Sequence, residues 1–140
     1  MQTFIMNNIW LVMLALASGV WLMWSFVQQL GVGAETISAS RATQLINQQA
    51  VVVVDVREQN EFLTGHLPEA KHLPLSGLEK TAIEFVKQHA GKGFIVYCQS
   101  GARAVSACKT LKKAGAEELF LLKDGIYGWV EANLPLNKKR

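Results

Sequence analysis

Charge is missing from the start of this sequence, because no Asp, Glu, Lys or Arg precedes Glu35. All 14 Lys and Arg and all 11 Asp and Glu of the 140 residues follow, so the chain has two parts. Half of the residues are hydrophobic, which excludes low-complexity disorder. Basic residues form no run of three or more except Lys138 to Arg140, so nucleic-acid binding has no support beyond a basic tail.

Cysteine is also scarce, with two residues, and the sequence has no C-x-x-C pattern. His66 and His72 do not lie at metal-ligand spacing from the cysteines. We therefore expect no metal and no other cofactor, and we expect both histidines to pack or to hold loops.

An uncharged apolar run of 19 residues extends from Ile9 to Val27. At 1.5 Å per residue, a helix of this length comes close to the roughly 30 Å hydrocarbon core of a bilayer. Near its ends lie Trp10, Trp21 and Trp24, whose rings favour the headgroup region. We predict an amino-terminal anchor over residues 1–30, with one transmembrane helix at about 9–27.

Two other interpretations of this run stay open. It could be a buried core helix, although it lacks the polar stripe of such helices. It could be a cleaved signal peptide, because Val32 to Ala34 are small enough for a cleavage site. Against this, no Lys or Arg precedes the run, and the run exceeds the usual length of roughly 7 to 15 residues.

Residues 31–36 form a short predicted linker to the charged part of the chain. Arg41 is the basic residue nearest the span, and by the positive-inside rule it favours a cytoplasmic carboxyl-terminal domain. We expect a single-pass protein of a bacterial inner membrane, with membrane lipids as partners. Residues 136–140 form a basic tail that is either solvated or attracted to anionic headgroups.

After Glu35, short apolar β-branched runs alternate with helical patterns, which is typical of an α/β fold with helices on both faces of a parallel sheet. We predict five strands, at residues 35–37, 50–54, 71–73, 94–97 and 119–122. We predict helices at residues 41–48, with Ser40 as the cap, and at 78–89, 103–114 and 127–132.

Cys98 lies where a buried strand ends and a loop leads directly into a helix. Sites form at this end of parallel strands, and backbone N–H groups of a tight loop, with the helix amino terminus, stabilise an anion there. Such surroundings favour the thiolate form of a cysteine, which is a nucleophile. Cys108 falls on the apolar face of the helix, so we expect a core thiol. A disulfide between the two would silence Cys98, so we expect a compartment that keeps thiols reduced.

Three stretches, in this order, resemble the single-domain rhodaneses, a family of sulfurtransferases. They are Val54 to Arg57 with Glu61-Phe62 and Gly65 to Ala70, then Cys98-Gln99-Ser100-Gly101-Ala102-Arg103, and finally Gly125 to Trp129. The resemblance covers about residues 37–135. It implies a three-layer α/β sandwich around a five-stranded parallel sheet, in which Cys98 is catalytic and carries a persulfide.

The resemblance further implies transfer of sulfane sulfur from a small donor such as thiosulfate to a thiol or cyanide acceptor. The loop residues Gln99, Ser100, Gly101 and Ala102 would surround the sulfur. Arg103 would attract an anionic donor.

Three further motif residues and Arg57 are candidates beside this loop. Arg57 would either bind the donor or hold neighbouring loops. Asp55, His66 and Trp129 would have structural roles.

Two other functions remain as alternatives. Protein phosphatases have five residues between the cysteine and the arginine of this loop, whereas Cys98 and Arg103 have four between them. This disfavours phosphatase and arsenate reductase activity. The second alternative is a membrane-tethered interaction module that binds other integral membrane proteins, with little or no catalysis.

Overall fold

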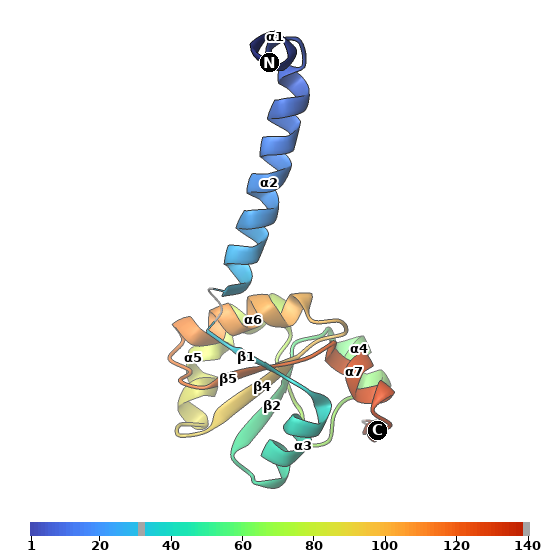
Figure 1. The fold of residues 1–140 in the computed structure, drawn as a ribbon. Coiled ribbons are helices and arrows are strands. Elements are labelled where there is room, and N and C mark those ends of the chain that lie inside the picture. Colours follow the sequence, from blue (N-terminus) through green and yellow to red (C-terminus); the bar gives the residue numbers. More distant parts are fainter. Residues whose placement is uncertain (31–32, 139–140) are drawn as a thin grey trace. The chain divides into compact units, whose positions relative to one another are not determined.

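The computed structural model describes residues 1–30 and 33–138 (Figure 1). Residues 31 and 32 of the predicted linker and the last two residues of the predicted basic tail lie outside the described residues. The chain divides into two compact units, Met1–Gly31 and Val32–Arg140. The boundary between the units falls within the stretch predicted as a linker.

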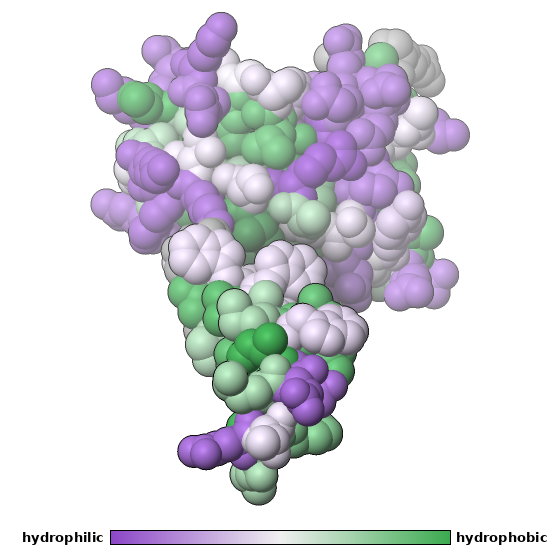
Figure 2. Space-filling view, turned by 90° about the horizontal axis from the view of Figure 1, so that it is seen from above, coloured by the Kyte–Doolittle hydropathy of each residue, from purple (hydrophilic) through white to green (hydrophobic). Residues whose placement is uncertain are grey.

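The first unit consists of the short helix α1 (Gln2–Asn7) and the long helix α2 (Ile9–Leu30). The segment Ile9–Val27 is long and apolar enough to cross a membrane, and it is 0% buried. Its surface is largely hydrophobic (Figure 2). The Ser18 hydroxyl donates to the Ala15 carbonyl oxygen at 2.9 Å, so this polar group is satisfied within the helix. The apolar stretch Ile9–Val27 coincides with the predicted span, and helix α2 continues three residues beyond it to Leu30.

The second unit contains a five-stranded parallel sheet, which confirms the predicted fold class (Figure 1). Its order is β1-β5-β4-β2-β3, and its strands are β1 (Glu35–Ile37), β2 (Val51–Asp55), β3 (Lys71–His72), β4 (Gly93–Tyr97) and β5 (Leu119–Leu122). The predicted boundaries agree with these to within one residue. The central strands β2, β4 and β5 are largely buried because helices cover both faces of the sheet, whereas the edge strands β1 and β3 are mostly exposed.

Alternate residues of β4 enter two separate cores, since successive strand side chains point to opposite faces. Phe94 and Val96 pack with helices α5 (Leu78–Gln88) and α6 (Ala102–Lys113). Ile95 and Tyr97 pack with helices α3 (Ala39–Asn47) and α7 (Gly125–Glu131). The result is the predicted three-layer sandwich.

The helix starts differ from the sequence prediction by two residues in two places, and α6 begins one residue before its predicted start, at Ala102. Ser38, rather than Ser40, caps α3, because its extended backbone lets its hydroxyl accept the Arg41 N–H at 3.2 Å. Helix α7 begins at Gly125, two residues before the predicted start. The short helices α4 (Gln59–Thr64) and η1 (Leu75–Gly77) were not predicted, since neither is long enough to show a helical period.

Candidate active site

Cys98 lies at the carboxyl end of β4, and the four-residue segment Cys98 to Gly101 leads directly into α6. Gly101 has φ +123°, a conformation that favours glycine. In this conformation its backbone N–H donates to the Cys98 sulfur at 3.0 Å. The sulfur therefore faces a backbone donor at the amino terminus of a 12-residue helix, an arrangement that stabilises negative charge.

The segment at the start of α7 holds this loop from the other side. The Ile126 N–H donates to the Cys98 carbonyl oxygen at 2.9 Å. A Cβ atom at Gly125 would overlap that same oxygen, and Gly125 also has φ +56°, so only glycine fits here. The third sequence motif, Gly125 to Trp129, thus holds the backbone of Cys98, the candidate catalytic residue.

Arg57 and Asp55 form a buried ion pair at the end of β2. The Arg57 guanidinium donates to the Asp55 carboxylate at 2.8 to 3.1 Å, to the Gly65 carbonyl at 2.6 Å and to the Gln99 side-chain oxygen at 3.3 Å. The Tyr97 hydroxyl donates to Asp55 at 2.7 Å. Burial lowers the pKa of Arg57, but the hydrogen bond and charge of Asp55 outweigh this effect and raise that pKa overall. The Asp55 carboxylate thus binds both Arg57 and Tyr97, and Arg57 ties β2 to the cysteine loop through Gln99.

Arg103 forms a second ion pair, with Glu61 of α4. The two guanidinium nitrogens donate to the two carboxylate oxygens at 2.7 and 2.9 Å, and both side chains are about one third exposed. The hydrogen bond from Arg103 lowers the pKa of Glu61. The hydrogen bond to Glu61 raises the pKa of Arg103, and the charges of Glu61, of a Cys98 thiolate and of Glu58 add to this increase. Arg103 is therefore within electrostatic reach of the cysteine.

Glu61 is a site residue that the sequence interpretation did not assign. It stands in the first matched stretch, four positions after Arg57, but its partner follows 42 residues later. One signal could have identified Glu61 from sequence: it is an acidic residue in the first matched stretch, and the cysteine loop that follows that stretch contains an arginine.

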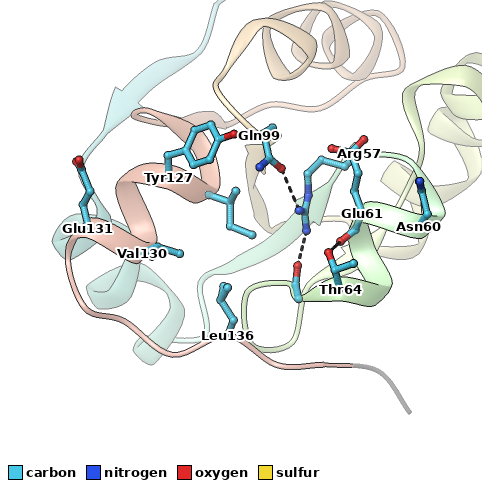
Figure 3. Close-up of a pocket in the computed structure, with 11 residues that line it drawn as sticks. Arg57, Asn60, Glu61, Thr64, Gln99, Tyr127, Val130, Glu131 and Leu136 are labelled. Carbon is cyan, nitrogen blue, oxygen red and sulfur yellow. Dashed lines mark hydrogen bonds between the residues drawn. The ribbon is translucent and has the colours of Figure 1, made fainter.

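A cavity of about 860 Å³ lies beside the loop (Figure 3). The residues of α7 and the chain after it give it an apolar side, and Arg57, Glu61 and Gln99 give it a polar side. Figure 3 shows the Gln99 side chain directed at Arg57. Within the described chain Cys98 is 1% exposed and is not a lining residue, so Gln99 is the loop residue that meets the cavity. Its lining residues are Arg57, Asn60, Glu61, Thr64, Gly65, Gln99, Ile126, Tyr127, Val130, Glu131 and Leu136.

The remaining loop residues lie at the surface. Ser100 is exposed, and Ala102 is the exposed first residue of α6. Neither side chain is buried in the site. In the part of the chain that the structure describes, no group of three or more His, Cys, Asp or Glu side chains could hold a metal ion.

His66 of the first motif and His72, two residues after that motif, pack around one aromatic ring. His66 and His72 stack on Phe62, with ring centroids 4.0 and 4.5 Å apart. Each also donates a ring N–H to a carbonyl oxygen, His66 to Leu67 at 2.9 Å and His72 to Arg57 at 2.7 Å. Both histidines hold loops.

The carboxyl-terminal segment is attached to the domain beyond the predicted boundary at residue 135. The buried Trp129 ring donates its N–H to the Pro135 carbonyl at 2.9 Å. His66 and Asn137 exchange two backbone hydrogen bonds of 2.8 Å, and Leu136 lines the cavity. Residues 136 and 137, assigned to the basic tail from sequence, thus contact the domain.

Cys108 is a fully buried core thiol of α6, and it forms no disulfide with Cys98. Burial raises the pKa of Cys108 to about 12. The thiol form therefore predominates at neutral pH, which makes Cys108 a poor nucleophile.

Comparison with known proteins identifies a family, relatives and solved structures that this chain resembles. The profile of the rhodanese-like domain matches residues 38–132. A sulfurtransferase of Allochromatium vinosum is 31% identical over 102 residues, which cover 73% of this chain and 92% of that protein. The uncharacterized protein slr1261 of Synechocystis is 39% identical over 105 residues, 75% of this chain, but the match spans only 57% of that relative.

A solved structure shares the fold. A rhodanese-related protein from Thermoplasma volcanium superposes with a TM-score of 0.65 and 26% identity, over 75% of this chain and 99% of that one. The matched range 38–132 contains the Cys98 loop, both ion pairs and Trp129.

Proposed function

This chain belongs to the rhodanese-like domain family, and we propose that it is a membrane-anchored sulfurtransferase. It would move sulfane sulfur from a donor such as thiosulfate to a thiol or cyanide acceptor through a persulfide on Cys98. One relative bears the name sulfurtransferase, and the match covers 92% of that protein. This supports the proposed class of reaction.

The observation that carries the proposal is the 3.0 Å hydrogen bond from the Gly101 N–H to the Cys98 sulfur. In the first step the Cys98 thiolate attacks the outer sulfur of thiosulfate. A new S–S bond forms, the S–S bond of the donor breaks, and its electron pair leaves with sulfite. In the second step the acceptor attacks the outer sulfur and the pair returns to Cys98. Cys98 is anionic before and after each step, so a fixed donor at this position serves both.

Mass spectrometry and transfer kinetics test this function in the full chain purified in detergent. We expect thiosulfate to add the mass of one sulfur to the peptide with Cys98, and cyanide to remove it as thiocyanate. Cys98→Ser should reduce turnover to the uncatalysed background, while Cys108→Ser, the matched control, should retain it. Undiminished turnover of Cys98→Ser would reject the mechanism.

The apolar helix supports the membrane part of the proposal. Its apolar side chains from Ile9 to Val27 are mostly exposed, and Trp10, Trp21 and Trp24 lie towards its two ends. Exposure of such a surface to water is costly, whereas a bilayer would cover it. We propose a single span of a bacterial inner membrane with the sulfurtransferase domain in the cytoplasm.

Protease treatment of sealed vesicles tests this arrangement. With the domain in the cytoplasm, protease should digest it in inside-out vesicles and leave it intact in right-side-out ones. The reverse pattern would overturn the orientation. Release of the full chain from membranes by carbonate washing would argue against the span.

A second candidate is an interaction module for integral membrane proteins, and the 1% exposure of Cys98 favours it. In that case Cys98→Ala would keep the function of the protein in cells, and membrane proteins would co-purify with the variant as with the unaltered chain. Loss of cellular function in Cys98→Ala would favour the enzyme.

A further inference from the structure

Both arginines of the site are already neutralised by a carboxylate. Arg57 is bound to the fully buried Asp55, and Arg103 binds Glu61 through two hydrogen bonds of 2.7 and 2.9 Å. A guanidinium in such a two-point pair has its best anion-binding face occupied. An anionic substrate must therefore compete with a carboxylate that the protein itself supplies.

The charges around the cavity add to this effect. Glu61 lines the cavity and belongs to one pair, and Glu131 of α7 also lines it. Glu58 is exposed, and its charge acts on Arg103. Among the described residues that line this cavity or form ion pairs with its lining, the carboxylates Asp55, Glu61 and Glu131 outnumber the guanidiniums Arg57 and Arg103.

We infer that Glu61 is a specificity-determining residue that biases Cys98 towards persulfide donors with a single net negative charge and against dianionic thiosulfate. This inference rests on the proposed function, because it concerns the first sulfur transfer to Cys98. Glu61 does so through Arg103, the cation next to the cysteine loop, whose charge it balances.

The two donors differ in the charge that gathers at the loop. Thiosulfate brings two negative charges to the thiolate, and sulfite leaves with two. A persulfide of cysteine brings one net negative charge: its outer sulfur forms the S–S bond with Cys98, its own S–S bond breaks, and the electron pair leaves on the cysteine thiolate. Because repulsion grows with the product of the charges, each nearby carboxylate penalises thiosulfate more than the persulfide.

The test measures how fast each donor loads Cys98 in the full chain in uncharged detergent, by acid quench and mass spectrometry. The readout is the ratio of the second-order rate constants for thiosulfate and cysteine persulfide, because a general loss of active protein cancels in that ratio. Glu61→Gln keeps the size of the side chain and an oxygen for Arg103 but removes the charge.

We expect Glu61→Gln to raise this ratio roughly fivefold in favour of thiosulfate, an effect of one unit charge in largely solvent-exposed surroundings. Glu61→Asp, which restores a carboxylate, should return the ratio towards that of the unaltered chain. Glu117→Gln is the matched control, since Glu117 is exposed just before β5, at the opposite end of the sheet, and should not change the ratio. An unchanged or lower ratio in Glu61→Gln overturns the inference.

Salt dependence gives a second measurement on the unaltered chain. Salt screens charge, so repulsion between the site and thiosulfate predicts a loading rate that rises or stays level with ionic strength. A rate that falls steeply would mean that an unbalanced cation attracts thiosulfate, and it would overturn the inference. Failure of the proposed function looks different, since neither donor would then place sulfur on Cys98.

Discussion

The end of β2 and the mouth of the cysteine loop each hold an arginine bound to a carboxylate, but their surroundings differ. The Asp55–Arg57 side chains are 0% and 3% exposed, and they also bind Tyr97, Gly65 and Gln99. The Glu61–Arg103 side chains are 30% and 35% exposed and bind chiefly each other. Because the first pair is buried, the loss of either partner should destabilise the fold. The second pair is partly solvated, so the loss of its carboxylate should mainly change the charge beside Cys98.

Loss of either partner from the buried Asp55–Arg57 pair should lower the free energy of unfolding strongly. Every buried side-chain nitrogen or oxygen atom among the described residues has a hydrogen-bond partner, and Asp55 alone accepts bonds from Arg57 and Tyr97. Removal of one charge leaves the other uncompensated in a poorly solvated place. The comparison therefore predicts large stability effects at Asp55 and small ones at Glu61.

The largest effect should come from Asp55→Asn, which leaves the Arg57 guanidinium buried without a counterion. We expect it to lower the free energy of unfolding by about 3–5 kcal/mol. Alkylation of Cys108 across a urea series measures this, because that thiol is fully buried in the folded domain and the first unit has no cysteine.

The double variant Asp55→Asn with Arg57→Met separates charge from packing. It should recover part of the lost stability, since no buried charge is left without a partner. If the double variant lost as much stability as the two single variants together, the two residues would not be coupled through charge.

An intermediate effect is expected from Tyr97→Phe. The Tyr97 hydroxyl donates to Asp55 at 2.7 Å and accepts the Leu67 N–H at 3.1 Å, and its loss leaves that N–H buried without this partner. We expect a loss of about 1–3 kcal/mol in the same urea assay. Tyr127→Phe is the matched control, because Tyr127 is 55% exposed, and it should change stability little. Equal effects of the two substitutions would contradict a buried network.

The sequence predicted the parts of this domain that depend on local pattern. The run Val51 to Val54 is a strand because both faces of the sheet are covered, and an uninterrupted apolar run signals such a position. The cysteine loop was found because its residues are consecutive. The cap at Ser38 was misplaced by two residues, since neighbouring serines offer the same hydroxyl and only the backbone geometry selects one.

The contacts that complete the site join distant segments, and no local pattern encodes them. The Glu61–Arg103 and Tyr97–Asp55 contacts each join residues 42 positions apart, and the His66–Asn137 pairing closes a still longer loop. The close approach of Gly125 to the Cys98 carbonyl likewise needs the folded sheet. The sequence therefore predicts candidate residues for the chemistry, but it does not show which of their charges are balanced by a partner.

The smallest stability effect should come from the exposed pair. We expect Glu61→Gln to lower the free energy of unfolding by at most about 0.2–1 kcal/mol, because solvent screens this pair. The hydrogen bond from Arg103 lowers the pKa of Glu61 below its ordinary value of 4.5 in the folded chain. The contribution of the pair is thus present above that value, and it is lost as the pH falls through the lowered pKa.

Urea unfolding followed by far-UV circular dichroism, at pH 6 and at pH 3, measures this difference between the unaltered chain and Glu61→Gln. The two chains should differ slightly at pH 6, and the difference should shrink as the pH falls through the lowered pKa of Glu61, because protonation removes the same charge that the substitution removes. A loss at pH 6 as large as that of Asp55→Asn would contradict the contrast between the two pairs. Glu61 would then hold the fold together, and a change in donor preference in its variants would no longer report on charge alone.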